Sequence, residues 1–169
     1  VRLQLEGKPG PLATAKDVTL AMLGHLGASG LLGFAAETCG RYVDKTSLSD
    51  RITIASMCTE MGGIINLFAP NDRVLEELGL TSGAAESLRP DEGAPYERTL
   101  SIDIQDLGPM VSRPGHPEDV IPVSDVKETK IGSAFIGSCT NGRYEDMLEA
   151  AGVLKGNEVA PGVVLKIVP

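Results

Sequence analysis

One short run of the sequence has the residue types and the spacing of a reactive thiol site. Cys139 lies within the run 137–141, Gly-Ser-Cys-Thr-Asn, after the apolar stretch 131–136 and before an amphipathic stretch. A cysteine between the end of a strand and the start of a helix lies where open α/β sheets bind ligands. The helix dipole there favours the thiolate, the form that ligates iron or attacks carbon. Because small and polar residues flank Cys139, we expect an approachable thiol.

Two other roles for Cys139 remain open when the residues are considered alone. A free cysteine commonly fills a tight turn as a small buried side chain. A catalytic nucleophile would instead need a base, and the histidines of the chain are His25 and His116. Neither has a spacing that predicts contact with the thiol, so the nucleophile hypothesis has no identified base.

A second group of candidate residues lies on a helix predicted over 51–61. Thr53, Ser56 and Glu60 recur at helical spacing and form a polar stripe, while Cys58 belongs to the apolar face. A carboxylate at Glu60 could move a proton to or from a metal-bound hydroxyl, or it could be an ordinary solvated side chain. Burial is the better interpretation for Cys58, and likewise for Cys39.

The elements that must position these residues follow from periodicity and from turn signals. Thr14 is expected to cap a helix with Asp17 completing the capping box, and Asp50 is expected to cap the helix that carries Glu60. Either Asn71 or Asp72 is expected to cap a short helix that ends at Gly79. The predicted helices cover 15–26, 51–61 and 141–154, and the predicted strands cover 31–38, 64–68, 99–104, 131–137 and 163–168.

Composition suggests where one domain ends and the next begins. The stretch 81–96 is rich in Ser, Gly, Pro, Glu and Asp. We therefore expect an α/β domain over 1–80, a linker over 81–98, and the start of a second α/β domain over 99–169. The stretch 108–123 holds four prolines and is expected to be ordered but irregular. The strand, helix and strand after 131 predict a βαβ unit with parallel strands.

Charge and cysteine usage exclude several classes of function. The formal net charge is −8, so binding to nucleic acid is not expected. No apolar run is long enough for a membrane span. The three cysteines are widely separated and odd in number, which favours a reducing, cytoplasmic setting. The chain starts with Val1 and not with Met, which is weak evidence for an internal fragment.

Several blocks of the sequence resemble the aconitase family. The run 137–147 is similar to the first cluster-cysteine motif of aconitases and isopropylmalate dehydratase large subunits. The run 14–18, Thr-Ala-Lys-Asp-Val, resembles a helix start of that family. The stretch 51–62 resembles its helix with Thr-Ile near the start and Glu-x-Gly at the end, and 116–123 resembles the stretch before the cluster strand. The blocks follow the family's order and cover nearly the whole chain.

The resemblance implies an α/β fold with aconitase-like α/β/α layers, parallel βαβ units and two sub-domains. It implies a [4Fe–4S] cluster, with Cys139 as one of three cysteine ligands and an open iron that acts as a Lewis acid on a hydroxy acid substrate. Glu60 matches the family's active-site glutamate. Ser56 stands where the family usually has Asn, which puts the ordinary substrate specificity in doubt. Asn141 would lie near cluster and substrate, together with Ser138 and Thr140.

The resemblance also implies parts that this sequence does not contain. The other two cluster ligands would come from a Cys-x-x-Cys motif, and a swivelling domain or small subunit would supply the base and the substrate-binding arginines. We therefore expect this chain alone to be inactive. The substrate would be a hydroxy di- or tricarboxylic acid, with the isopropylmalate and homoaconitate branch favoured. The alternative is a relative that lacks the cluster and uses the same fold for binding or for RNA regulation.

Overall fold

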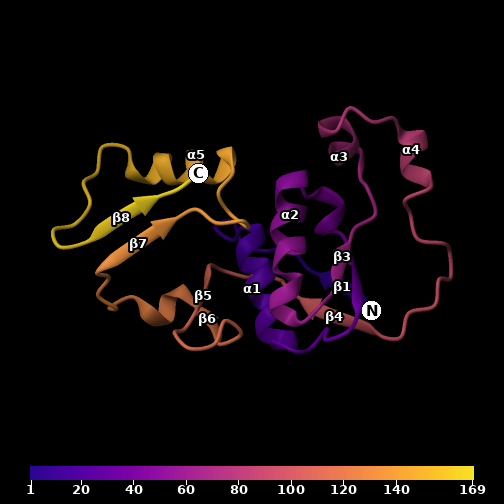
Figure 1. Cartoon of the computed structure of the whole chain (residues 1–169), viewed down its shortest axis with the longest axis horizontal. Helices are drawn as coiled ribbons and strands as arrows, with labels where there is room; N and C mark the ends of the chain where they lie inside the picture. Colours follow the sequence, from indigo (N-terminus) through magenta and orange to yellow (C-terminus); the bar gives the residue numbers. More distant parts are fainter. The chain divides into compact units, whose positions relative to one another are not determined.

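The computed structural model describes the backbone of residues 1–169 and all side chains except those of Ser82 and Ala84. The chain divides into two compact units, Val1–Val123 and Ser124–Pro169 (Figure 1). Each unit is built around its own sheet, with four strands in the main sheet of the first unit and two strands in the second. None of the helices described here is long and apolar enough to cross a membrane.

The first unit is built on a parallel sheet. Its strands are β1 (Arg2–Glu6), β2 (Ala35–Cys39), β3 (Ile65–Leu67) and β4 (Thr99–Asp103), in the order β3-β2-β1-β4. Helix α1 (Ala15–Leu26) connects β1 to β2, and α2 (Leu48–Ser56) lies between β2 and β3. Both connections step in the same direction across the sheet, so right-handed crossovers place both helices on one face. The predicted parallel α/β architecture is confirmed.

The strands of this sheet bury one face and leave the other in water. Along β1, Leu3 and Leu5 are buried whereas Arg2, Gln4 and Glu6 are exposed or half-exposed. The same alternation occurs in β2 and β4. Helices α1 and α2 cover the buried face.

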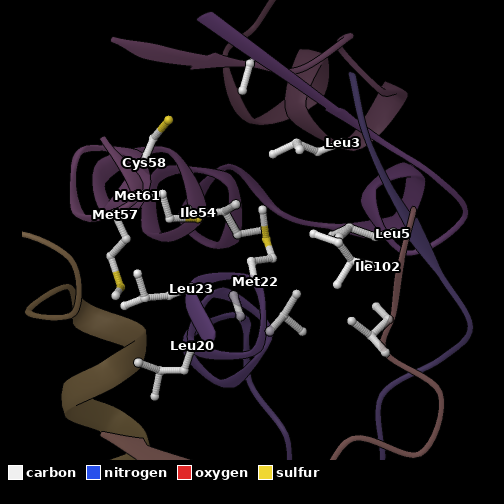
Figure 2. Packing of buried hydrophobic residues seen from close by; sticks show 14 of the residues in the cluster. Leu3, Leu5, Leu20, Met22, Leu23, Ile54, Met57, Cys58, Met61 and Ile102 are labelled. Carbon is white, nitrogen blue, oxygen red and sulfur yellow. The ribbon is translucent and has the colours of Figure 1, made fainter. Parts of the chain in front are cut away.

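The core of the first unit lies between the sheet and the two helices. Figure 2 shows Leu3, Leu5 and Ile102 of the sheet facing Met22 of α1 and Ile54 of α2. All five side chains are at most 3% exposed. Their burial is the main favourable contribution to the stability of this unit, at about 25 cal/mol for each Å² of apolar surface removed from water.

Helix α1 begins at the predicted cap. The Asp17 carboxylate accepts hydrogen bonds from both the backbone N–H and the hydroxyl of Thr14, at 2.7 and 2.8 Å. Its other oxygen accepts the Met110 N–H at 2.7 Å. Met110 starts a short antiparallel hairpin of β5 (Met110–Ser112) and β6 (Val120–Pro122), which packs on α1. The stretch 108–123, predicted as irregular, therefore contains a hairpin. The buried carboxylate of Asp17 links this hairpin to α1.

The helix that carries Glu60 differs from its prediction at both ends. Ser47 caps α2, and Asp50 occupies the third helical position of a capping box instead of the cap. The α-helix ends at Ser56, and a 3₁₀-helix, η2 (Met57–Met61), continues the chain. The sequence missed this change because the apolar positions remain buried in both helix types. Gly62 then ends η2.

The segment expected as a linker, 81–98, lies between two elements of the first unit. That segment contains α4 (Ser82–Glu86), and the strand that follows it, β4, pairs with β1 in register over five residues. The compact units divide after Val123. A polar composition marks a surface segment, but it does not tell whether the chain returns to the same sheet. The preceding helix α3 (Asp72–Glu77) is capped by Asn71, one of its two predicted caps.

The second unit is the predicted βαβ unit. Strands β7 (Ser133–Ile136) and β8 (Val164–Ile167) are parallel neighbours, and α5 (Tyr144–Leu154) connects them. The amphipathic stretch that follows Cys139 in the sequence would ordinarily bury one face of this helix. Within the described structure, none of the residues of α5 is buried, and Tyr144 and Leu148 are 75% and 58% exposed. One helix on two strands has too little sheet surface to cover it.

Candidate functional site

The thiol of Cys139 lies on the loop that connects β7 to α5. The loop starts at Gly137, whose φ is +130° and whose position admits no side chain, because an added Cβ would lie 1.9 Å from the carbonyl oxygen of Val168. The chain after β7 therefore stays against the end of β8 as it turns. This close approach fixes the start of the loop at the carboxyl end of both parallel strands.

Ser138 organises the residues around the cysteine. Its hydroxyl oxygen accepts the backbone N–H groups of Thr140 and Asn141, at 3.2 and 2.9 Å, and lies 2.8 Å from the Thr140 hydroxyl. This is a local turn made by a serine side chain. Thr140 is buried and packs inward, so Cys139 between them is directed to the surface and is exposed. The prediction of an approachable thiol is confirmed, and the alternative of a buried turn residue is wrong.

The helix begins later than predicted, which changes the electrostatic argument for this cysteine. Residue Arg143 is the cap and Tyr144 the first helical residue of α5, whereas the predicted helix began at Asn141. The helix dipole acts mainly on groups within the first turn. Cys139 lies outside that turn. The helix starts where Arg143 and Asp146 form its capping box, two residues after Asn141.

Asn141 is held firmly beside the cysteine. Its side-chain NH₂ donates to Asp146 at 3.0 Å, and the other oxygen of Asp146 accepts the Arg143 N–H at 3.0 Å. The Arg143 guanidinium lies 3.9 Å from the same carboxylate. The side-chain oxygen of Asn141 is buried and has no hydrogen-bond donor in the described structure. It is shielded from solvent in this structure, so a ligand could use it only after the surrounding loop moves.

Asp146 is a residue that the sequence argument undervalued. Its two oxygens orient the Asn141 amide and the start of α5. The available signal was its place three residues after the cap, where capping-box acids occur. Gly137 was likewise treated as a strand end, although a glycine directly after an apolar strand is a sign of close backbone approach.

Glu60 and Ser56 lie in the first unit, in η2 and at the end of α2. The Glu60 side chain is exposed and has no ion pair or hydrogen bond with a described residue. The Ser56 hydroxyl donates to the Thr53 carbonyl at 3.1 Å, within its own helix. Thr53 is buried, so the predicted polar stripe loses one member. In a 3₁₀-helix four residues turn the chain by about 480°, against about 400° in an α-helix, so Glu60 is rotated away from the line of Ser56.

The other two cysteines are in different surroundings. Cys58 is 1% exposed within the apolar core, and burial raises the pKa of its thiol. Its predicted burial is confirmed. Cys39 is only half-buried, and its sulfur accepts a hydrogen bond from Nε of Arg2 at 3.2 Å. Burial was the wrong expectation for Cys39, because it lies on the polar face of β2.

The described residues supply one thiol suited to an iron–sulfur centre. Iron–sulfur clusters are bound by cysteine thiolates, and an exposed thiol beside an oriented amide oxygen fits one such ligand. No group of three or more His, Cys, Asp or Glu side chains that could hold a metal occurs among these residues. A cubane cluster would therefore need further thiolates besides Cys139.

The chain is similar throughout its length to known proteins. The model of the aconitase family (aconitate hydratase) matches residues 1–169. The 3-isopropylmalate dehydratase large subunit 1 of Methanopyrus kandleri is 40% identical over 169 residues, which are 99% of this chain and 40% of the relative. The 3-isopropylmalate dehydratase large subunit of Oleidesulfovibrio alaskensis is 41% identical over 169 residues, covering all of this chain and 40% of the relative. The chain thus spans about two fifths of the length of these relatives.

Proposed function

The chain belongs to the aconitase family, and from this premise we propose that it is part of an iron–sulfur hydro-lyase acting on a hydroxy di- or tricarboxylic acid. Such an enzyme removes a proton from one carbon and hydroxide from the next, and adds them back in the reverse direction. The observation that carries the proposal is the exposed Cys139 thiol at the carboxyl end of β7, flanked by the Ser138 turn and the Asn141 amide.

In this proposal Cys139 is one of the thiolate ligands of a [4Fe–4S] cluster, and the remaining ligands come from sequence outside Val1–Pro169. When bound, the cluster supplies a Lewis-acidic iron for the substrate hydroxyl and carboxylate. Ser138 holds the loop that presents Cys139, and Thr140 anchors it inward. The Asn141 amide, which Asp146 orients, is the group next to Cys139 that we propose lies near the cluster and the substrate.

Glu60 is the proposed catalytic carboxylate. It is exposed, belongs to a short rigid helix, and has no described partner that would occupy it. Its role is to take or give the proton of the departing hydroxyl group. Ser56, which stands in place of the family's usual Asn, can accept a hydrogen bond but offers no amide donor. We propose that this difference affects which hydroxy acid is bound.

The relatives suggest the substrate and the partner. Because the similar proteins are named 3-isopropylmalate dehydratase large subunit, we propose 3-isopropylmalate or a close analogue as substrate and a separate small subunit as partner. The small subunit would supply the groups that neither unit described here contains. The chain itself, at two fifths of the relatives' length, is proposed to be inactive alone. A cytoplasmic setting suits thiolate ligands, which need reducing conditions.

A cysteine substitution tests the ligand assignment. In the complete enzyme, Cys139→Ser should prevent assembly of an intact cluster, because an alcohol is a poor ligand for iron in such clusters. The measurement is visible absorbance and acid-labile sulfide after anaerobic reconstitution with iron and sulfide. The matched control is Cys39→Ser, a half-exposed cysteine on the first sheet, which should keep its cluster. Cluster content equal to wild type in Cys139→Ser would refute the assignment.

A carboxylate substitution tests the role of Glu60. We expect Glu60→Gln to retain the cluster and to lower kcat by about 10²- to 10⁴-fold, the usual contribution of a general acid or base. Turnover of 3-isopropylmalate and absorbance of the cluster are measured on the same sample. Glu76→Gln is the control, since Glu76 is another exposed carboxylate of the first unit, and it should leave both quantities unchanged. Unaltered turnover in Glu60→Gln would reject the catalytic role.

A further inference from the structure

A basic pocket lies at the carboxyl end of the first unit's sheet. It has a volume of about 510 Å³ and is bordered by the turns that directly follow β1, β2 and β4. Open α/β sheets bind ligands at this end of their strands, and the volume is in the range of small-molecule sites. Glu60 follows α2, which runs back toward the other end of the strands. The basic pocket is therefore separate from Glu60, the carboxylate proposed for the hydro-lyase reaction.

The charge of this pocket is opposite to that of the chain as a whole. The chain has a formal net charge of −8, yet Lys8, Arg41 and Lys45 line the pocket together. None of these three cations forms an ion pair with a carboxylate among the described side chains. The acid in the lining, Asp50, already accepts the backbone N–H and the hydroxyl of Ser47, at 2.9 and 2.7 Å. The lining thus contains three cations that have no ion-pair partner and one carboxylate that already accepts two hydrogen bonds.

Neutral donors complete the lining. The Gln105 side-chain oxygen accepts the Lys8 N–H at 3.1 Å, which leaves the amide NH₂ as a donor. Burial, Asp50 and Asp17 raise the pKa of Tyr42, so its hydroxyl remains protonated near neutral pH. Such a hydroxyl can donate to an anion. The donors in this pocket therefore come from turns after three different strands.

The turns that carry these groups are held in place by backbone packing. Gly40, directly before Arg41, has a φ of +121°, and an added Cβ would lie 2.2 Å from the carbonyl oxygen of Leu5. The backbone that follows β2 therefore lies in direct contact with the backbone of β1. Val43, between the cationic residues, is 3% exposed and anchors the turn in the core. The backbone that carries these cations is therefore held in place before a ligand binds. This lowers the conformational entropy that is lost on binding.

From these observations we propose that the basic pocket binds a small multivalent oxyanion, carrying two or more phosphate or carboxylate groups. Lysine ammonium groups and an arginine fork are the side chains that recognise both kinds of group. An anion with two or three negative charges would match the three cations. Because the pocket lies within one unit and contains no cysteine, binding there does not depend on the cluster or on the hydro-lyase assignment.

Calorimetric titration of the chain Val1–Pro169 tests the proposal. Pyrophosphate and citrate are titrated separately, and glycerol serves as the uncharged control ligand. We expect pyrophosphate or citrate to bind, and the stronger of the two identifies whether phosphate or carboxylate is preferred. In the triple variant Lys8→Gln, Arg41→Gln, Lys45→Gln the affinity should fall at least tenfold, because the charge-assisted hydrogen bonds are lost.

A matched variant separates local recognition from overall charge. Lys127→Gln, Lys130→Gln, Lys155→Gln makes the same change in net charge at exposed positions of the second unit, and it should bind as wild type does. Binding by neither anion to the wild-type chain, or equal losses in both triple variants, would overturn the proposal. Amide chemical shifts of the wild-type chain give a second measurement that needs no variant. Anion-induced shifts must concentrate at residues 8, 41, 45 and 105, and shifts elsewhere alone would also overturn it.

Discussion

The three cysteines illustrate how strongly the surroundings of one atom decide its chemistry. Cys139 lies on an exposed loop, Cys39 accepts a hydrogen bond from Arg2, and Cys58 is enclosed by apolar side chains. A thiol reacts as its thiolate and only where a reagent can reach it. The chain therefore has one thiol suited to binding a metal, one in a polar but partly covered place, and one that is part of the core.

This difference predicts the order in which the thiols react. At pH 8 with a disulfide reagent such as DTNB, Cys139 should react fastest and Cys58 slowest, by about a hundredfold or more, since a buried group reacts only after local opening. The raised pKa of Cys58 acts in the same direction, because at a given pH it lowers the thiolate fraction of this residue. Rates are followed at the three sites by mass spectrometry. Equal labelling of Cys58 and Cys139 would contradict the environments described here.

At the scale of single elements, the loop before α5 depends on one close backbone contact. Gly137→Ala would place a Cβ 1.9 Å from the Val168 carbonyl at a φ of +130°. We expect a loss of about 1–3 kcal/mol in the free energy of unfolding, as for other strained backbone positions. Denaturant titration with a fluorescence or NMR signal from the second unit measures it.

The same helix provides a control for this substitution. Gly152 lies within α5, and a Cβ added there would have no heavy atom within 4 Å. Gly152→Ala should therefore stabilise the chain by about 0.5–1 kcal/mol, the gain expected inside a helix. If both alanine variants changed stability in the same direction, the contact with Val168 would not be the cause.

Sequence predicted the elements in this chain better than their ends. The Thr14–Asp17 capping box, the Asn71 cap and the βαβ unit around Cys139 follow from local rules and are all observed. The start of α5 was missed because Asn141 is itself a good helix cap, and only the structure shows that Arg143 with Asp146 caps the helix instead. Local signals can be read from sequence, but a choice between two good local signals cannot.

For the candidate site, the sequence predicted the exposure of one thiol but not the geometry around it. An exposed Cys139 was expected and is observed. The change to a 3₁₀-helix after Ser56, which takes Glu60 out of line with Ser56, was not predicted. Nor could pattern alone assign β4 to the first sheet, because pairing between residues 2–6 and 99–103 is a long-range contact. Such contacts depend on which surfaces fit together, and not on local propensity.

At the scale of the whole chain, the two units differ in how much of themselves they bury. Strand β1 has neighbours on both sides, and its side chains Leu3 and Leu5 are at most 1% exposed. The second unit has two strands, each with a free edge, and exposes Phe135 and Val164 by 59% and 54%. Two strands and one helix bury too little apolar surface for much stability of their own.

Hydrogen exchange should reveal this difference. In the chain Val1–Pro169, amides of β1 and α1 should be the last to exchange, since they open only with the whole first unit. Peptides that cover β7 and β8 should exchange much faster, by at least tenfold, because little burial opposes their opening. Exchange followed by mass spectrometry gives the comparison at the level of peptides. Comparable protection in both units would show that the second unit has stability that its burial does not explain.

The change from α2 to η2 has a consequence for which genetic changes this segment can accept. Each residue of a 3₁₀-helix advances the direction of the next side chain by about 120°. A one-residue insertion or deletion between Ser56 and Glu60 would therefore swing the carboxylate by a third of a turn, and would also misplace the buried Met57 and Met61. Exposed Thr59 can change its identity without such an effect. In this segment the number of residues is constrained more tightly than their types, so an evolving gene would tolerate codon replacement there but not a gain or loss of codons.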